Sequence, residues 1–262
     1  MGIVNLTPDS FYDGGKYSGI DKYLLQTEQM ITEGAAVVDI GAFSSRPGAK
    51  LISMKKEAVR LIPVLKDLIK HFPQTIFSVD TYRSEIAKQC FETGAGIIND
   101  ISGGNYDKEM FSTIAKLNIP YILMHLHGLP EDMQQNPIRK NASQEIKLFF
   151  QEKVDVLNKL GFDKTILDPG YGFGKSLDCN YEILKNQNNL KINNLPIMAG
   201  LSRKSVVNKV LNTKPKDALN GTTILNLMAL QNGANILRVH DVKEAVETVK
   251  LFKYYENIDS CD

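Results

Sequence analysis

Eight short apolar runs in this chain each end on a polar or charged group. The first is Ile3-Val4-Asn5, the second is Val37-Val38-Asp39, and the last is Ile236-Leu237-Arg238-Val239-His240. The five between them cover 76–80, 97–100, 121–125, 165–168 and 197–200. Continuous apolar runs are typical of strands buried on both faces of a parallel sheet. Eight such strands alternating with helices predict an α/β fold, a (β/α)8 TIM barrel with its functional groups at the carboxyl ends of the strands.

Apolar residues with helical spacing fill the gaps between these runs. We expect helices near 21–33, 53–70, 84–93, 107–117, 143–160, 179–187, 217–232 and 242–257. Regular alternation of strand and helix favours parallel strands joined by right-handed crossovers. A doubly wound open sheet is the structural alternative, but eight units of this spacing favour closure.

The chain of 262 residues fits one barrel, which typically takes ~250 residues. Because no linker or low-complexity tract divides it, we expect a single barrel domain over 1–262. The first predicted strand begins at the first residues. We therefore expect either a chain trimmed at its N-terminus or one with a late start, with a cost mainly to stability.

Charge and cysteine usage narrow the class of protein further. The 31 basic and 30 acidic residues give a net charge of +1, which offers no reason to expect nucleic acid or a membrane surface as partner. No apolar stretch approaches the ~20 residues that span a bilayer, and no signal peptide is visible. The three cysteines show no metal spacing. We expect a cytoplasmic protein with small-molecule partners.

Acceptor groups end three of the predicted strands. Asp80, Asn99 and Asp168 would converge in the mouth of a barrel and suit a heterocycle that presents an amino group and ring N–H donors. Asp168 begins the segment Asp-Pro-Gly-Tyr-Gly-Phe-Gly-Lys, in which interleaved glycines let the backbone approach a flat ligand. A structural ion pair and a plain turn are the alternatives for these two features.

Cationic groups end other strands or lie in the adjoining loops. Arg46, Lys204, Arg238 and His240 form this set, and barrels often hold phosphate after strands seven and eight. Two long strand-to-helix loops, 7–15 and 43–49, carry Arg, Asp and aromatic residues, which favours a functional lid. Asn5, Asp9 and Asp13 could complete a Mg2+ site together with substrate phosphates. The two sets together predict a heterocycle with a phosphate leaving group.

Three other kinds of site are disfavoured. The segment 168–176 lacks the first glycine of a phosphate-binding P-loop, because Pro169 stands there. His125 and His127 have no carboxylate or Cys at helical metal spacing, which argues against zinc. Ser202 and Ser205 fit hydrogen bonding to a ligand better than nucleophilic catalysis, since no Ser-His-Asp arrangement is visible.

Taken together, these motifs resemble the dihydropteroate synthase family over essentially the whole chain. The segments that carry the resemblance are Ser45-Arg-Pro-Gly48, Ser78-Val-Asp-Thr81, Ile97-Ile-Asn-Asp100, 168–175 and Ser202-Arg-Lys-Ser205. The resemblance implies a (β/α)8 barrel, usually a homodimer, that acts in folate synthesis. It also implies a reaction that joins 7,8-dihydropterin-6-ylmethyl diphosphate to 4-aminobenzoate and releases diphosphate. Such enzymes are sulfonamide targets.

The resemblance assigns roles position by position. It implies catalytic roles for Arg46, Lys204 and Asp13, and Mg2+ ligation by Asn5 and Asp13. The residues implied to bind the pterin are Asp80, Asn99, Met124, Asp168 and Lys204. Those implied to bind the diphosphate are Asn5, Arg46, Arg238 and His240. Those implied to shape the aminobenzoate pocket are Ser45, Pro47, Phe173 and Ser205.

The chain departs from the family pattern in its second long loop. Ala42-Phe43 replaces a common Gly-Glu, and Ser45 stands where Thr is common, which bears on how the aminobenzoate ring fits. A pterin-binding methyltransferase domain and a non-catalytic pterin-binding paralogue are the alternatives. The methyltransferase needs neither the diphosphate set nor the Ser-Arg-Pro-Gly segment, so their presence argues against it. A non-catalytic paralogue would be expected to lose Arg46, Lys204 or the Mg2+ ligands, and all of these are present.

Overall fold

The computed structural model describes residues 1–6, 19–42, 52–128 and 133–258. Within them the strands form a parallel six-stranded sheet in chain order and a parallel two-stranded sheet. The strands are β1 (Gly2–Asn5), β2 (Val37–Gly41), β3 (Ile76–Asp80), β4 (Ile97–Asp100), β5 (Tyr121–Met124), β6 (Thr165–Asp168), β7 (Met198–Ala199) and β8 (Ile236–Leu237). Each corresponds to one of the eight apolar runs.

Backbone hydrogen bonds join the two sheets at both ends and close the ring. At one seam the N–H of Leu167 in β6 donates to Pro196 O over 2.8 Å, just before β7. At the other, Ile3 N donates to Val239 O over 3.1 Å and Val239 N donates to Met1 O over 2.9 Å. The predicted eight-stranded barrel is therefore confirmed, with short strands at its seam.

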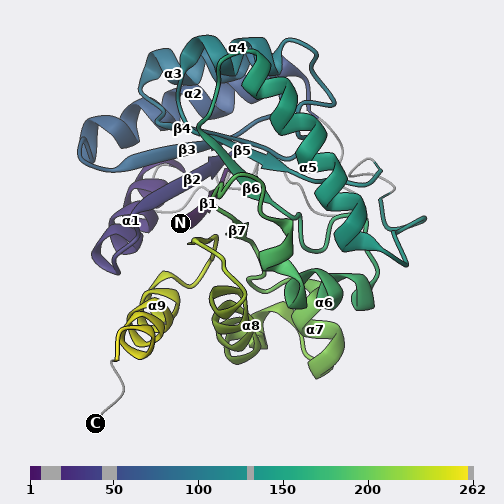
Figure 1. The fold of residues 1–262 in the computed structure, drawn as a ribbon. Coiled ribbons are helices and arrows are strands. Elements are labelled where there is room, and N and C mark those ends of the chain that lie inside the picture. The colour runs from purple at the N-terminus through teal and green to yellow at the C-terminus, as the bar shows by residue number, and fades with distance from the viewer. Residues whose placement is uncertain (7–18, 43–51, 129–132, 259–262) are drawn as a thin grey trace.

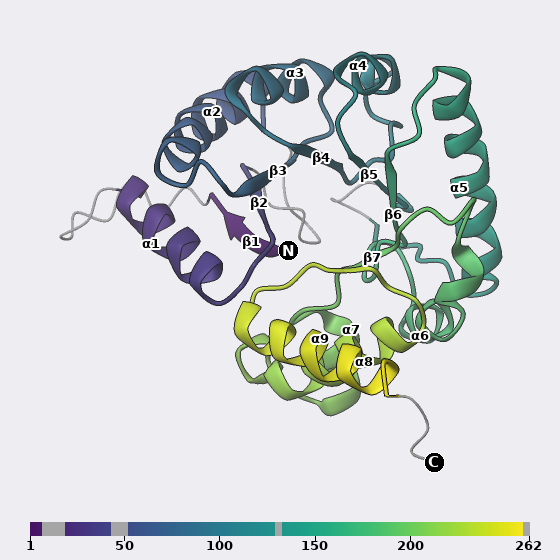
Figure 2. The ribbon, with the colours of Figure 1, turned by 60° about the vertical axis from the view of Figure 1, so that its left-hand side comes forward.

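Helices surround the ring of strands (Figures 1 and 2). The helices are α1 (Gly19–Thr32), α2 (Met54–His71), α3 (Ser84–Thr93), α4 (Met110–Leu117), α5 (Ala142–Lys159), α6 (Leu177–Lys185), α7 (Ser205–Leu211), α8 (Leu219–Gln231) and α9 (Val242–Glu256). Two 3-10 turns, η2 (Gln187–Leu190) and η3 (Pro215–Asp217), lie between them. All eight predicted helices are present, whereas α7 was not predicted. No helix in the described part of the chain has the length and apolar character needed to cross a membrane.

Alternation of side chains along each strand separates two cores. Val38, Ile40, Phe77 and Val79 face outward and belong to the large cluster packed against the helices. The residues between them face the barrel axis, where a second cluster fills the lower part of the barrel with Ile97, Ile122, Ile166 and Met198. Two residues after each of these along the chain lie Asn99, Met124, Asp168 and Gly200. The predicted acceptors therefore stand directly above an apolar floor.

The apolar run predicted that Asp39 ends its strand, and this prediction was wrong. β2 continues through Ile40 to Gly41, and it is Gly41 that pairs with Asp80 at the end of β3. Asp39 pairs with Ser78 and therefore lies one side-chain layer below the mouth, fully buried. The strand continues because Ile40 still packs against the outer helical layer.

Candidate active site

A small cavity opens at the carboxyl ends of the strands. Nine residues from six strands and their following loops line it: Asp80, Asn99, Ile101, Met124, Asp168, Phe173, Gly200, Lys204 and Arg238. Seven of them were predicted as site residues, and the structure brings these seven together. The acceptor set and two of the cations thus share one mouth.

The acceptor side of the cavity carries unused hydrogen-bonding capacity. Oδ1 of Asp80 and Oδ1 of Asn99 are buried without a hydrogen-bond partner anywhere in the described residues. Oδ1 of Asp168 accepts from the N–H of Gly170 over 2.8 Å. Burial raises the pKa of Asp168, and burial together with the neighbouring Asp39 raises the pKa of Asp80. Because unpaired buried acceptors are costly, a ligand that brings hydrogen-bond donors would satisfy this wall.

The loop after β6 is shaped by glycines and a buried lysine. Nζ of Lys175 donates to the carbonyls of His125, Gly170 and Phe173 at 3.1, 2.9 and 2.9 Å. Burial lowers the pKa of Lys175 to about 7. Gly170 has φ +67°, and a Cβ there would lie 2.1 Å from His125 O. The loop therefore folds tightly onto the end of β5, which fixes Phe173 at the cavity.

This loop gives a prediction that separates backbone strain from collision. Gly170→Ala is expected to cost about 1–2 kcal/mol for the left-handed backbone plus a further ~1–3 kcal/mol or more for the clash. Gly161→Ala is the matched control, because Gly161 has φ +76° and a Cβ there would meet nothing within 4 Å. Denaturant unfolding measures both. Equal losses in the two variants would contradict the close packing of the loop on His125.

Lys204 spans the loop and the cation side. Its Nζ donates to Tyr171 O over 2.7 Å and lies 4.6 Å from the centroid of the Phe173 ring. Burial lowers the pKa of Lys204 to about 8, although Asp168 acts in the opposite direction. Lys204 therefore sits between the aromatic ring and the acceptor wall.

Arg238 lies between two carboxylates. Its Nε and Nη2 are each 2.7 Å from Oδ2 of Asp39, and Nη2 is 3.6 Å from Oδ2 of Asp80. The side chain of Asp39 is fully buried, whereas 17% of the Arg238 side chain is exposed. The guanidinium thus reaches from the inside of the barrel to its mouth.

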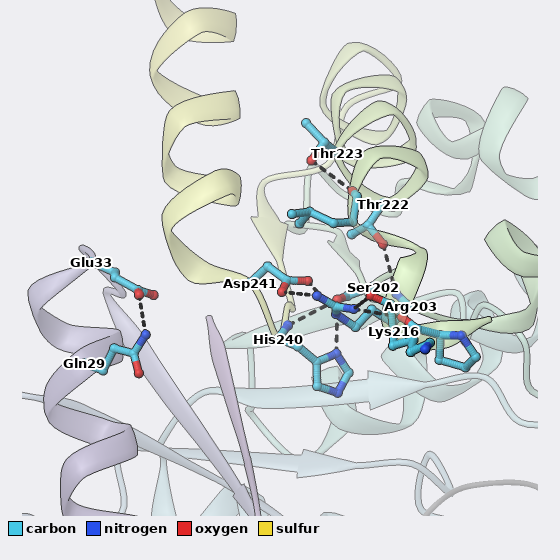
Figure 3. A network of polar contacts seen from close by, with 11 residues as sticks. Gln29, Glu33, Ser202, Arg203, Lys216, Thr222, Thr223, His240 and Asp241 are labelled. Atoms are coloured by element: carbon cyan, nitrogen blue, oxygen red, sulfur yellow. Dashed lines mark hydrogen bonds and ion pairs between the residues drawn. The ribbon is translucent and has the colours of Figure 1, made fainter. Parts of the chain in front are cut away.

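Polar contacts hold the loops after β7 and β8 against one another (Figure 3). Oγ of Ser202 lies 3.0 Å from Nδ1 of His240 and accepts from the His240 N–H over 3.2 Å. Arg203 donates from Nε and Nη2 to the two carboxylate oxygens of Asp241 at 2.9 and 2.7 Å, and from Nη1 to the carbonyls of Pro215 and Lys216. These contacts fix His240 and Lys204 at neighbouring positions on the rim.

Some predicted site residues lie apart from the cavity lining. Asn5 is exposed at the end of β1, His240 is exposed on the rim, and Ser205 is exposed at the start of α7. Four predicted site residues lie outside the described residues: Asp13, Ser45, Arg46 and Pro47. Asp9 lies outside them as well. The roles of all these residues stay predictions.

Asp39 was not predicted as a site residue. Besides Arg238, its Oδ2 accepts from Nδ2 of Asn99 over 3.0 Å. The available signal was a carboxylate inside an apolar run, because such a group needs a partner when the strand is buried. Ile101 and Gly200 were missed too, and they complete the apolar part of the lining.

Acceptors on one side and cations on the other define a class of binding site. A flat ring that carries N–H donors would satisfy the acceptors, and an anionic substituent would lie towards Arg238 and Lys204. Both sets stand at the mouth of a (β/α)8 barrel, where enzymes of this fold carry out their chemistry. The fold and site are those of a (β/α)8-barrel enzyme that acts on a small molecule.

Comparison with known proteins identifies the family. Residues 1–240 match the family model described as pterin binding enzyme. The chain is 38% identical over 253 residues to the dihydropteroate synthase of Escherichia coli K12, covering 96% of this chain and 89% of that protein. It is also 39% identical over 259 residues to the folic acid synthesis protein fol1 of Pneumocystis carinii, of which it spans only 35%. The chain belongs to the pterin binding enzyme family.

Solved structures agree with this assignment. A dihydropteroate synthase of Yersinia pestis in a sulfonamide drug complex has a TM-score of 0.91 and 37% identity, covering 98% of this chain and 94% of that one. The Xanthomonas albilineans dihydropteroate synthase with 4-aminobenzoic acid has a TM-score of 0.91 and 33% identity, covering 98% and 93%. The barrel described above is therefore the fold of these proteins.

Proposed function

We propose that this chain is a dihydropteroate synthase, a transferase in folate biosynthesis. It joins 7,8-dihydropterin-6-ylmethyl diphosphate to 4-aminobenzoate, so that 7,8-dihydropteroate and diphosphate form. The observation that carries this proposal is a pair of acceptors, Asp80 Oδ1 and Asn99 Oδ1, in a cavity shared with Lys204 and Arg238. Neither acceptor has a hydrogen-bond partner among the described residues. The dihydropteroate synthases among the relatives support it.

In this proposal the acceptor wall holds the pterin and the cations hold the diphosphate. Asp80, Asn99 and Asp168 accept from the ring, with Met124 packed in the wall and Lys204 above Phe173. Arg238 with His240 and Arg46 binds the leaving group. The C–O bond breaks, its electron pair leaves with the diphosphate, and the arylamine attacks the methylene carbon and releases a proton. Fixed charges aimed at the separating ions lower the barrier.

The aminobenzoate pocket is formed by Ser45, Pro47, Phe173 and Ser205. Asp13 completes the catalytic set.

We further propose Mg2+ as the cofactor, held by Asn5 and Asp13 with diphosphate oxygens. Asn5 suits this role because it is exposed at the carboxyl end of β1. Those residues contain no cluster of three His, Cys, Asp or Glu side chains that could hold a metal ion alone. Substrate oxygens would therefore supply ligands, as is common for Mg2+. The bound ion would neutralise charge on the diphosphate.

The lowered pKa of Lys204 predicts an alkaline limit. The Lys204 ammonium keeps its proton below about pH 8 and loses it above, where an unperturbed lysine would still be charged. The ratio kcat/KM for the pterin substrate reports on the free enzyme, so it is expected to fall above about pH 8. Lys204→Arg stays charged and is the control. If kcat/KM of Lys204→Arg fell in the same way above about pH 8, a group other than Lys204 would be responsible.

We also propose that the chain forms a homodimer through α7 and α8. α8 buries Leu225, Ala229 and Leu230 against the barrel but also exposes Ile224, Leu227 and Met228. α7 packs beside it and exposes Val210 and Leu211. A helix that is apolar on both faces is normally covered.

Charge placed on this face tests the dimer. Ile224→Glu is expected to turn a dimer into a monomer in sedimentation experiments, because the new carboxylate would be buried unpaired. Leu148→Glu is the matched control, since Leu148 is an exposed apolar residue on α5. A wild-type monomer, or an Ile224→Glu dimer, would contradict the proposal.

Turnover by the purified protein tests the proposed activity. The protein is mixed with the dihydropterin diphosphate, 4-aminobenzoate and Mg2+, and dihydropteroate is detected by chromatography and mass. A parallel reaction with excess chelator tests the metal, and it is expected to be inactive. Absence of product in the complete mixture would refute the function. We place this activity in the cytoplasm, because the described cysteines, Cys90 and Cys179, are free.

A further inference from the structure

Asp39 occupies a position that the proposed reaction does not use. It is fully buried and does not line the cavity. One of its oxygens, Oδ2, accepts hydrogen bonds from Nε of Arg238 at 2.7 Å and from Nδ2 of Asn99 at 3.0 Å, and Nη2 of Arg238 forms an ion pair with the same oxygen at 2.7 Å. A single atom therefore joins the cation side of the site to its acceptor side.

The bond to Asn99 fixes which end of that amide faces the ligand. A carboxylate only accepts, so the atom that approaches Asp39 is the Asn99 nitrogen. Oδ1 of Asn99 is then left on the other side, where it has no partner among the described residues. Without Asp39 the amide could turn over and present a donor to the ring.

The bonds to Arg238 keep it from closing on Asp80. The guanidinium lies 3.6 Å from Oδ2 of Asp80, close enough for attraction and 0.9 Å further than its bond to Asp39. Because Nε donates to Asp39 and Nη2 is drawn to the same oxygen, Oδ1 of Asp80 has no hydrogen-bond partner among the described residues. A charge-assisted hydrogen bond together with an ion-pair contact holds the guanidinium against Asp39.

We propose that Asp39 is a positioning residue that holds Asn99 and Arg238 in their ligand-binding orientations through one shared oxygen. This inference deepens the proposed function and rests on it. Asp39 touches no substrate. It acts by keeping one side chain as an acceptor and the other as a cation directed at the mouth.

Asp39→Asn is the variant that tests this, since it keeps the shape and removes the charge. Arg238 is expected to shift towards Asp80, which occupies the acceptor that the ring needs. Affinity for a phosphate-free dihydropterin, followed by its fluorescence, and affinity for inorganic diphosphate, followed by calorimetry, should both fall about tenfold or more. A change confined to one side of the site would weaken only one of the two affinities.

Glu57→Gln is the matched control. Glu57 is also a fully buried carboxylate paired with an arginine, Arg83, whose side chain is 18% exposed. Its other partner is Thr81, at 2.6 Å, and none of the three lines the cavity. Glu57→Gln is expected to lower stability as Asp39→Asn does, yet to keep both affinities within about twofold.

Nuclear magnetic resonance gives a readout independent of turnover. In 15N-labelled protein the Nε–H signal of Arg238, assigned by its loss in Arg238→Lys, should exchange slowly in the wild type and rapidly in Asp39→Asn. An unchanged signal, or unchanged affinities with an active wild type, would overturn the inference and leave the proposed function intact. A wild type without turnover would overturn the function, whereas the exchange measurement would still decide the role of Asp39.

Discussion

Asp168→Asn is expected to abolish pterin binding while leaving the fold intact. The asparagine oxygen can keep the bond from the Gly170 N–H, so the loop after β6 should still form. The other carboxylate oxygen becomes an NH2 group and opposes the donors of the ring. Losing about 3 kcal/mol of hydrogen bonding to a charged acceptor corresponds to at least about a hundredfold in affinity.

Fluorescence titration with a phosphate-free dihydropterin measures this loss. Diphosphate affinity of the same variant serves as the internal control, because Asp168 lies on the acceptor wall and Arg238 holds the anion in our proposal. A melting temperature close to that of the wild type would show that the loop is intact. Retained pterin affinity would remove Asp168 from the ring site.

Arg238→Gln is expected to lose affinity for diphosphate rather than for the pterin, and also to destabilise the barrel. The variant leaves Asp39 buried without its counter-ion, and breaking a buried ion pair from one side costs about 3–5 kcal/mol. Diphosphate affinity should be lost with the guanidinium. Chemical denaturation and calorimetry with inorganic diphosphate measure the two effects.

Arg238→Lys separates charge from geometry. Lysine keeps a positive charge but cannot reproduce the contacts of both Nε and Nη2 with Asp39. Most of the stability should therefore return, and diphosphate affinity only in part. An Arg238→Gln protein as stable as the wild type would contradict the buried pair. Equal affinity in Arg238→Lys and the wild type would show that geometry is unimportant.

The fold was predictable because long periodic segments signal it strongly. The helix expected over 84–93 has the observed bounds of α3, and the eight apolar runs became the ring. The helix α7 was missed because its seven residues, Ser205–Leu211, are too few to show a period. Asp39 was predicted at the end of its strand but lies within it. An apolar run followed by a carboxylate has the same sequence pattern whether the carboxylate ends the strand or stands in its middle.

The sequence predicted which residues line the site better than how their side chains are oriented. Residue type and strand ends indicated Asp80, Asn99, Asp168, Lys204 and Arg238. Which atom of Asn99 faces the ligand depends on Asp39, 60 residues away in the chain, and Arg238 reaches the same atom from 199 residues away. Such orientation is set by tertiary contacts that no local pattern encodes.

The strands β7 and β8 have only two residues each, so the local stability of the barrel differs from one side to the other. Fewer backbone bonds tie this sector to its neighbours than tie β2 to β3, which pair over five residues. Amide protons near Ala199 and Leu237 should therefore exchange with solvent sooner than those of Val79. On warming, the side of the mouth that carries Lys204 and Arg238 would loosen while the side that carries Asp80 and Asn99 still keeps its shape.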